Sequence, residues 1–179
     1  LNGNGEVVSV GDTGLDHTVA FFQDVSGENV TMLKDPFFFN ETNETSAVLN
    51  KSHRKIIGYW PLMDARDYAG GHGTHVAGTV AGAAGHACAI AGERQCSLAR
   101  FDGMAPEAKL LFADLQCNTP DGCDCGWHEW CPCVDYPDGR CPSDQYLYPP
   151  DDLASGYLRP LYNLGARINS NSWGRGCPS

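Results

Sequence analysis

The sequence predicts an α/β fold, with a mainly parallel sheet and helices on both faces. The observations behind this fold class are short, β-branched apolar runs and longer helix-like segments between them. The predicted strands are residues 6–10, 55–60, 109–115 and 167–172, and the predicted helices are residues 72–84 and 152–164. Strands that alternate with helices along one chain build a parallel sheet that is covered by helices.

The first predicted strand is bounded by Gly5 and Gly11 and has the composition of a buried parallel strand. Residues 17–54 are mostly polar, and the aromatic run at residues 37–39 is their expected apolar anchor. We therefore predict that residues 17–54 form a long connection on the surface.

The helix that begins near His72 is unusually rich in small residues. Each interior glycine costs a helix roughly 1 kcal/mol relative to alanine, so these glycines need a compensating reason. Val76 and Val80, four residues apart, form the only sizeable apolar stripe. We expect the helix backbone to approach a neighbouring strand closely and to hold His72 rigidly.

Asp12 and Ser172 both lie at the carboxyl ends of predicted strands. In open α/β sheets, ligands bind outside the carboxyl ends of the strands. The two residues are therefore expected at the same edge of the sheet, where the strands have their carboxyl ends.

The chain is acidic, with 22 Asp and Glu against 12 Lys and Arg and a formal net charge of −10. This charge disfavours binding to a phosphate backbone, so no nucleic-acid partner is expected. No apolar run approaches the roughly 20 residues of a membrane helix, so no membrane segment is predicted in these residues. Cationic substrates and calcium remain as electrostatic options.

Nine cysteines in 179 residues indicate an oxidising compartment. Four glycosylation sequons cluster in one interval, which independently favours an extracellular or secretory-pathway protein. Their acceptor residues are Asn29, Asn40, Asn43 and Asn50.

Residues 117–141 are predicted to be a cysteine-rich insertion within the domain. With few aliphatic residues it cannot build a core, so disulfides are favoured. A metal cluster that includes His128 is the alternative, but the paired CxxC spacing of common zinc sites is absent, and no metal site is predicted. Cys177 is the odd cysteine. The disulfide candidates are Cys88, Cys96, Cys117, Cys123, Cys125, Cys131, Cys133 and Cys141.

Residues 71–82, GHGTHVAGTVAG, resemble the histidine motif of the subtilisin-like serine proteases, the subtilases. Three further segments resemble that family in the expected order: 6–16 its aspartate segment, 103–110 its GMAP segment and 166–174 its NSWG strand. GDTGLD and NSWG are similar to the versions in large extracellular members. The resemblance covers about the whole chain and implies that residues 1–179 are the N-terminal part of a subtilisin-like catalytic domain.

The resemblance implies a serine endopeptidase that acts on protein or peptide substrates and requires no cofactor. Asp12 would accept a hydrogen bond from His72, and His72 would take the proton of the serine nucleophile. The segment Ser172-Trp173-Gly174 would pair with the substrate backbone. Because no GTSMA-like segment occurs in the 179 residues, the nucleophile is expected beyond them, and this excerpt alone is expected to be inactive.

Structural calcium is compatible with the resemblance, although Asp16, Asp64 and Asp67 form no recognisable ligand loop. The resemblance also implies that the insertion at residues 117–141 borders the cleft. We expect its acidic residues to narrow the cleft and to favour basic peptides, with a purely structural role as the alternative.

Two other functions stay open at this point. Asp12-Thr13-Gly14 also spells the aspartic protease triad, but only one copy occurs and that mechanism gives His72 no role. A pseudoprotease that binds peptides without cleaving them is the second alternative.

The sequence departs from the family pattern at the residue before Asp12. Gly11 occupies a position where subtilases more often have an aliphatic residue.

Overall fold

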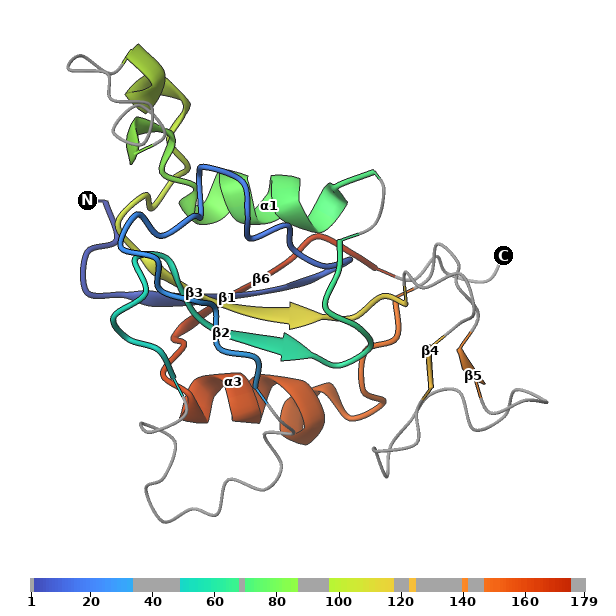
Figure 1. The fold of residues 1–179 in the computed structure, drawn as a ribbon. Coiled ribbons are helices and arrows are strands. Elements are labelled where there is room, and N and C mark those ends of the chain that lie inside the picture. The colour runs from blue at the N-terminus through green and yellow to red at the C-terminus, as the bar shows by residue number, and fades with distance from the viewer. Residues whose placement is uncertain are drawn as a thin grey trace.

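The structure, a computed structural model, describes residues 2–33, 49–67, 70–86, 97–117, 123–124, 140–141 and 147–174. It contains a four-stranded sheet in the order β2-β3-β1-β6 (Figure 1). The strands are β1 Val7–Asp12, β2 Ile56–Pro61, β3 Lys109–Asp114 and β6 Ile168–Asn171. All three pairings are parallel, as predicted.

Helices cover both faces of the sheet, which confirms the predicted fold class. Helix α1, His72–Ala81, crosses one face, and the π-helical turn η4, Ala154–Leu158, continues into α3, Arg159–Asn163, on the other (Figure 1). The remaining described elements are the 3₁₀ turn η3, Ser97–Phe101, and the antiparallel pair β4, Cys123–Asp124, and β5, Arg140–Cys141.

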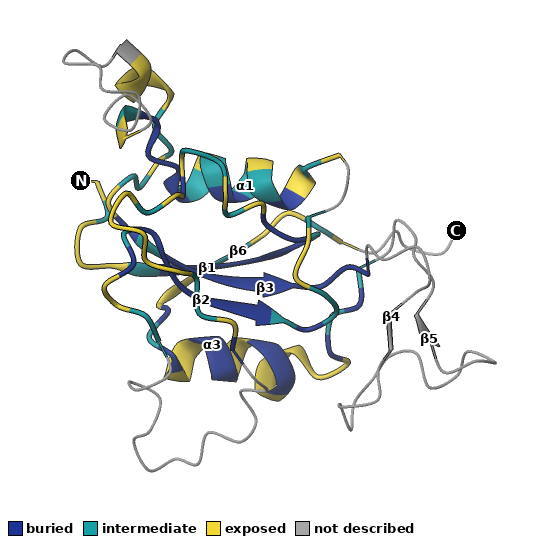
Figure 2. Cartoon of the chain, in the orientation of Figure 1, coloured by how far each residue is buried: buried dark blue, intermediate teal, exposed yellow. Residues whose placement is uncertain are grey.

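The central strands β1 and β3 place alternate residues in two cores, one on each face. Val10 and Phe112 are fully buried in the core beneath α1, whereas Leu111 packs with α3. Because side chains alternate along a strand, Asp12 follows Val10 onto the α1 face and Gly11 faces α3. Figure 2 shows the buried centre of the sheet, while β6 is exposed at both of its end residues.

The buried stripe of α1 differs from the predicted one. Its buried residues are Gly73, Ala77 and Ala81, at four-residue spacing, whereas Val76 and Val80 are only partly buried beside them. The prediction of a close helix approach was therefore correct, but the valines flank the contact instead of forming its centre. The helix also ends at Ala81, before the predicted residue 84.

The sequence predicted that the second strand begins at Lys55, but β2 begins at Ile56. Lys55 precedes β2, is 1% exposed, and its Nζ donates hydrogen bonds to the carbonyl oxygens of Pro106 at 2.9 Å and Ala108 at 2.6 Å. These two bonds give the buried amine hydrogen-bond acceptors and fix the chain just before β3.

The segments that flank the predicted insertion meet beyond the carboxyl end of β3. Gln116 and Leu147 form an antiparallel bridge, and the Tyr148 N–H donates to the carbonyl of Leu115 at 2.7 Å. Cys117 is buried and disulfide-bonded, and the backbones of Cys123 and Cys141 lie opposite each other in the β4–β5 pair. The other predicted features fall outside the described residues: residues 37–39, Asn40, Asn43, Cys88, Cys96, Cys125, His128, Cys131, Cys133 and Cys177.

Candidate active site

Asp12 and His72 meet at the carboxyl end of β1. Asp12 is the last residue of the strand and is fully buried, and His72 is the first residue of α1. The distance between Nδ1 of His72 and Oδ1 of Asp12 is 2.6 Å. The carboxylate can therefore hold the imidazole with its proton on Nδ1, which leaves Nε2 as the basic nitrogen. The His72 side chain is 51% exposed, so a reactant can reach it.

The two oxygens of the Asp12 carboxylate have different surroundings. Oδ1 also accepts a hydrogen bond from the Thr13 N–H at 2.8 Å, whereas the buried Oδ2 has no hydrogen-bond partner among the described residues. A buried polar atom without a partner is uncommon in folded proteins, and a catalytic role is one explanation for it.

Asp67 and Thr13 supply the N-terminal cap that α1 lacks. The N-cap residue Gly71 has left-handed backbone angles and no capping side chain. In its place, the Gly73 N–H donates to Oγ1 of Thr13 at 2.9 Å, and the Thr74 N–H donates to Oδ2 of Asp67 at 2.9 Å.

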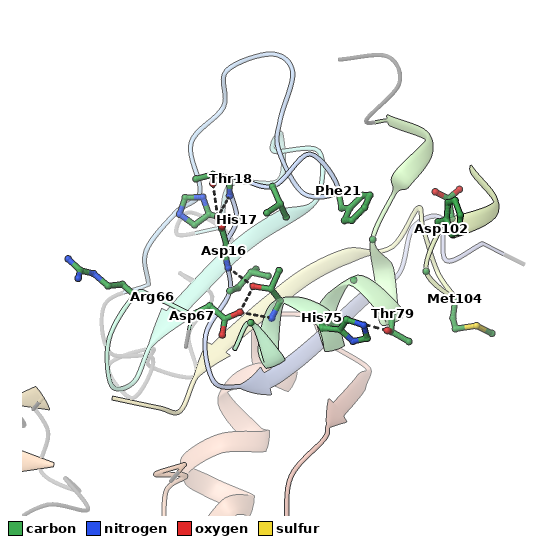
Figure 3. Close-up of a pocket in the computed structure, with 18 of the residues that line it drawn as sticks. Asp16, His17, Thr18, Phe21, Arg66, Asp67, His75, Thr79, Asp102 and Met104 are labelled. Atoms are coloured by element: carbon green, nitrogen blue, oxygen red, sulfur yellow. Dashed lines mark hydrogen bonds between the residues drawn. The ribbon is translucent and has the colours of Figure 1, made fainter. Parts of the chain in front are cut away.

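The Thr13 hydroxyl in turn donates to Oδ1 of Asp67 at 2.8 Å. The Thr74 hydroxyl also donates to Asp67, which is labelled in Figure 3. We call these contacts of Asp67 with Thr13 and Thr74 the clamp. Because Thr13 follows Asp12 directly, the clamp connects the end of β1, which carries Asp12, to the start of α1, which carries His72. From the sequence, Asp67 was considered only in relation to calcium, so this role was not predicted. The signal that could have revealed it is the absence of a capping side chain at position 71.

Asp114 is a second buried carboxyl group, at the end of the neighbouring strand. It lies opposite Asp12 in the β1–β3 register and accepts a 2.6 Å hydrogen bond from the Tyr59 hydroxyl. Burial raises the pKa of Asp114 well above its ordinary value. Asp114 therefore has Tyr59 as its partner, while Asp12 has His72. This arrangement disfavours the aspartic protease alternative, in which two carboxyl groups share one proton.

The segment Ser172-Trp173-Gly174 follows β6 at the same edge of the sheet. Trp173 is partly buried, and its Nε1–H donates to the carbonyl oxygen of Gly11 at 2.8 Å. Ser172 and Gly174 are exposed. The structure thus attaches the predicted substrate segment to the residue that precedes Asp12.

A broad groove runs along α1 and reaches the start of this helix, where Asp67, Gly71 and Thr74 line it. It is lined by residues 15–19 and 21, by α1 side chains such as His75 and Thr79, and by residues 101–104 (Figure 3). Neither Asp12 nor His72 lines it. The Asp12–His72 pair therefore lies at the exposed edge formed by the strand ends, beside the groove and outside its lining.

Other predicted site residues lie elsewhere. Asn29 is exposed, whereas Asn50 is half-buried and its Nδ2 donates to Oε2 of Glu28 at 2.9 Å. In the described part of the chain, no group of three or more His, Cys, Asp or Glu residues could hold a metal ion. The same part contains no helix with the length and apolar character needed to span a bilayer.

Comparison with known proteins identifies a family and several relatives. The profile of the Subtilase family matches residues 3–179. Two relatives from Dictyostelium discoideum are the serine protease/ABC transporter B family proteins tagB, 32% identical over 174 residues, and tagD, 33% identical over 175 residues.

Each alignment covers 97% of this chain but only 7% of the relative, so the chain spans a small part of the relatives it matches. The family match, by contrast, includes the strand and the helix that bring Asp12 to His72. The protein belongs to the subtilase family.

Proposed function

We propose that this chain is the N-terminal part of the catalytic domain of a serine endopeptidase. Asp12 and His72 are two members of its catalytic triad, and the nucleophilic serine comes from residues outside 1–179. The observation that carries the proposal is the 2.6 Å contact between a fully buried carboxylate and a half-exposed imidazole.

In this mechanism Asp12 orients His72 and stabilises the imidazolium that forms during the reaction. Nε2 takes the serine proton as the hydroxyl attacks the peptide carbonyl, and later gives it to the leaving amine. The Thr13 N–H on Oδ1 of Asp12 and the clamp through Asp67 keep the two side chains in place before the substrate arrives.

Protein or peptide substrates bind alongside residues 172–174 as an added extended strand. Ser172 and Gly174 are exposed there, so an incoming peptide can reach them. The hydrogen bond from Trp173 to the Gly11 carbonyl supports this role, because it fixes the segment next to the catalytic carboxylate.

Peptide cleavage by the full-length protein that contains this chain tests the proposal. Asp12→Asn should lower kcat by about 10⁴-fold and His72→Ala by about 10⁶-fold, the losses typical of the aspartate and the histidine of a serine protease triad. His75→Ala is the matched control, because His75 lies one turn from His72 and is exposed. Its cleavage rate should equal that of the wild type.

Labelling with a fluorophosphonate separates catalysis from binding. Label that depends on His72 supports the endopeptidase, since the probe reacts only with an activated serine. A full-length protein that binds peptides but neither cleaves them nor takes up the label would be a pseudoprotease.

The further properties are also proposals. The nine cysteines and four sequons support an extracellular or secretory-pathway protein with disulfides and glycans. A glycosidase should then increase the gel mobility of the natural protein. Structural calcium has no support from a carboxylate cluster in the described residues, so a chelator that lowers the melting temperature would be its first evidence.

The insertion at residues 117–141 is proposed to border the cleft and to favour basic peptides. Its flanks join through Gln116 and Leu147, so residues 118–146 can be replaced by a short glycine linker without separating them. An unchanged cleavage profile on a peptide library after this replacement would contradict the specificity role.

A further inference from the structure

Gly11, the residue before the proposed catalytic Asp12, leaves room for the side chain of Tyr157 from another element. A Cβ built on Gly11 would lie 1.8 Å from the hydroxyl oxygen of Tyr157 and 2.8 Å from its Cζ. The φ angle of Gly11 is not positive, so space and not backbone conformation requires the glycine. Tyr157 therefore occupies the volume that a side chain at position 11 would fill.

Tyr157 reaches this place from the π-helical turn η4, on the face of the sheet opposite to α1. It is 1% exposed. Single π-helical turns inside helices are frequent at functional sites, because they redirect side chains. Burial raises the pKa of Tyr157 to about 12, so its hydroxyl stays protonated at neutral pH and can donate a hydrogen bond.

The hydroxyl joins the proposed catalytic strand to the proposed substrate strand. It donates to Oδ1 of Asn171 at 2.8 Å and accepts from Nδ2 of Asn169 at 3.3 Å. Nδ2 of Asn169 also donates to Oγ of Ser9 in β1 at 2.7 Å. A partly buried polar network therefore links β6 to β1 beside the apolar core on this face.

We propose that Tyr157 is a positioning residue that sets where residues 172–174 lie relative to Asp12. Its hydroxyl packs against Gly11 and donates a hydrogen bond to Asn171, the residue just before the substrate segment. This inference rests on the proposed peptidase function and adds a specific residue to it. Removing the hydroxyl should let the substrate segment move relative to the Asp12–His72 pair without changing that pair.

Tyr157→Phe in the full-length protein tests the role with two substrates. For a peptide long enough to pair with residues 172–174, KM should rise about three- to tenfold, the value of one neutral hydrogen bond. For a short activated ester that does not reach the segment, kcat and KM should stay unchanged. A merely destabilised protein would instead lose active molecules, which lowers kcat equally for both substrates and leaves KM unchanged.

Tyr162→Phe is the matched control. Tyr162 lies five residues later on α3 and is 58% exposed, and loss of its hydroxyl should change neither constant. If Tyr157→Phe does not fold, Asn171→Ala removes the acceptor of the same hydrogen bond and should raise KM for the long peptide in the same way. An unchanged KM in the folded variant overturns the inference.

A size exchange tests the shared space. Gly11→Ala should lose activity because its Cβ meets the Tyr157 ring, and Gly11→Ala combined with Tyr157→Leu should recover part of that loss. Equal losses in the single and the double variant would contradict the proposed contact.

Failure of the peptidase proposal gives a different result. A wild-type protein that cleaves neither substrate refutes that proposal alone. Calorimetry with the long peptide then decides the role of Tyr157: weaker binding by Tyr157→Phe supports the positioning role, and equal binding overturns it.

Discussion

Gly73 lies against the backbone of Gly14, so closely that a Cβ built on Gly73 would come 2.1 Å from the Gly14 carbonyl oxygen. Gly73 follows His72 in α1, and Gly14 lies two residues after Asp12. This contact therefore seats the first turn of the helix directly on the loop that carries the carboxylate. It explains why a glycine, which weakens a helix, is retained at this position.

Gly73→Ala and Gly78→Ala should change stability in opposite directions. At Gly73 the added methyl group overlaps a backbone oxygen, and such overpacking should lower the free energy of unfolding by about 2 kcal/mol or more. At Gly78 nothing lies within 4 Å of an added Cβ, so the better helix propensity of alanine should raise the free energy of unfolding by up to about 1 kcal/mol.

Denaturant unfolding of the two variants measures this difference, and each is the control for the other because both are glycine-to-alanine changes in one helix. Equal destabilisation would show that glycine is needed along the whole helix and would contradict the contact with Gly14.

Asp67→Ala should weaken both the fold and catalysis. It removes the acceptor of the Thr74 N–H and the partner of the Thr13 hydroxyl, and loss of such a cap costs about 1–2 kcal/mol of unfolding free energy. The rate should also fall, because His72 lies in the same helical turn. Asp67→Asn keeps an oxygen acceptor and should lose less of both.

Asp151→Ala, at an exposed aspartate outside this network, is the control and should match the wild type. A stable and fully active Asp67→Ala protein would contradict the clamp.

The sequence predicted β1, β2 and β3 because each is a short apolar run, but it misplaced the contact face of α1. Val76 and Val80 have the largest apolar side chains, whereas burial follows Gly73, Ala77 and Ala81. The reason is distance: where a helix lies very close to neighbouring backbone, the smallest residues form the contact.

The pairing of Asp12 with His72 was expected from the motif resemblance, whereas the supporting residues were not. Tyr157 and Asp67 act through tertiary contacts with residues that are 146 and 54 positions away, Gly11 and Thr13. Local patterns do not encode such contacts. Gly11 was nevertheless a usable signal, because a glycine where an aliphatic residue is usual indicates that another side chain fills the space.

Lys55 makes stability depend on pH. Desolvation by burial, with Arg54 and Lys109 nearby, lowers the pKa of Lys55 from 10.5 to about 7, although two carbonyl oxygens accept hydrogen bonds from its amine. The unfolded chain keeps this proton up to about pH 10.5, whereas the folded chain releases it near pH 7. Between these values the unfolded state binds more protons, so the free energy of unfolding rises with pH.

The slope due to Lys55 in this window approaches about 1.4 kcal/mol per pH unit. Lys55→Met lacks this titrating group. The unfolding free energy of the wild type minus that of the variant should therefore increase as pH rises from about 7 to 10. Lys51→Met, which removes an exposed lysine four residues earlier, is the matched control. Urea unfolding at several pH values measures the difference, and parallel stability curves for the wild type and Lys55→Met would mean that the folded protein keeps Lys55 charged throughout.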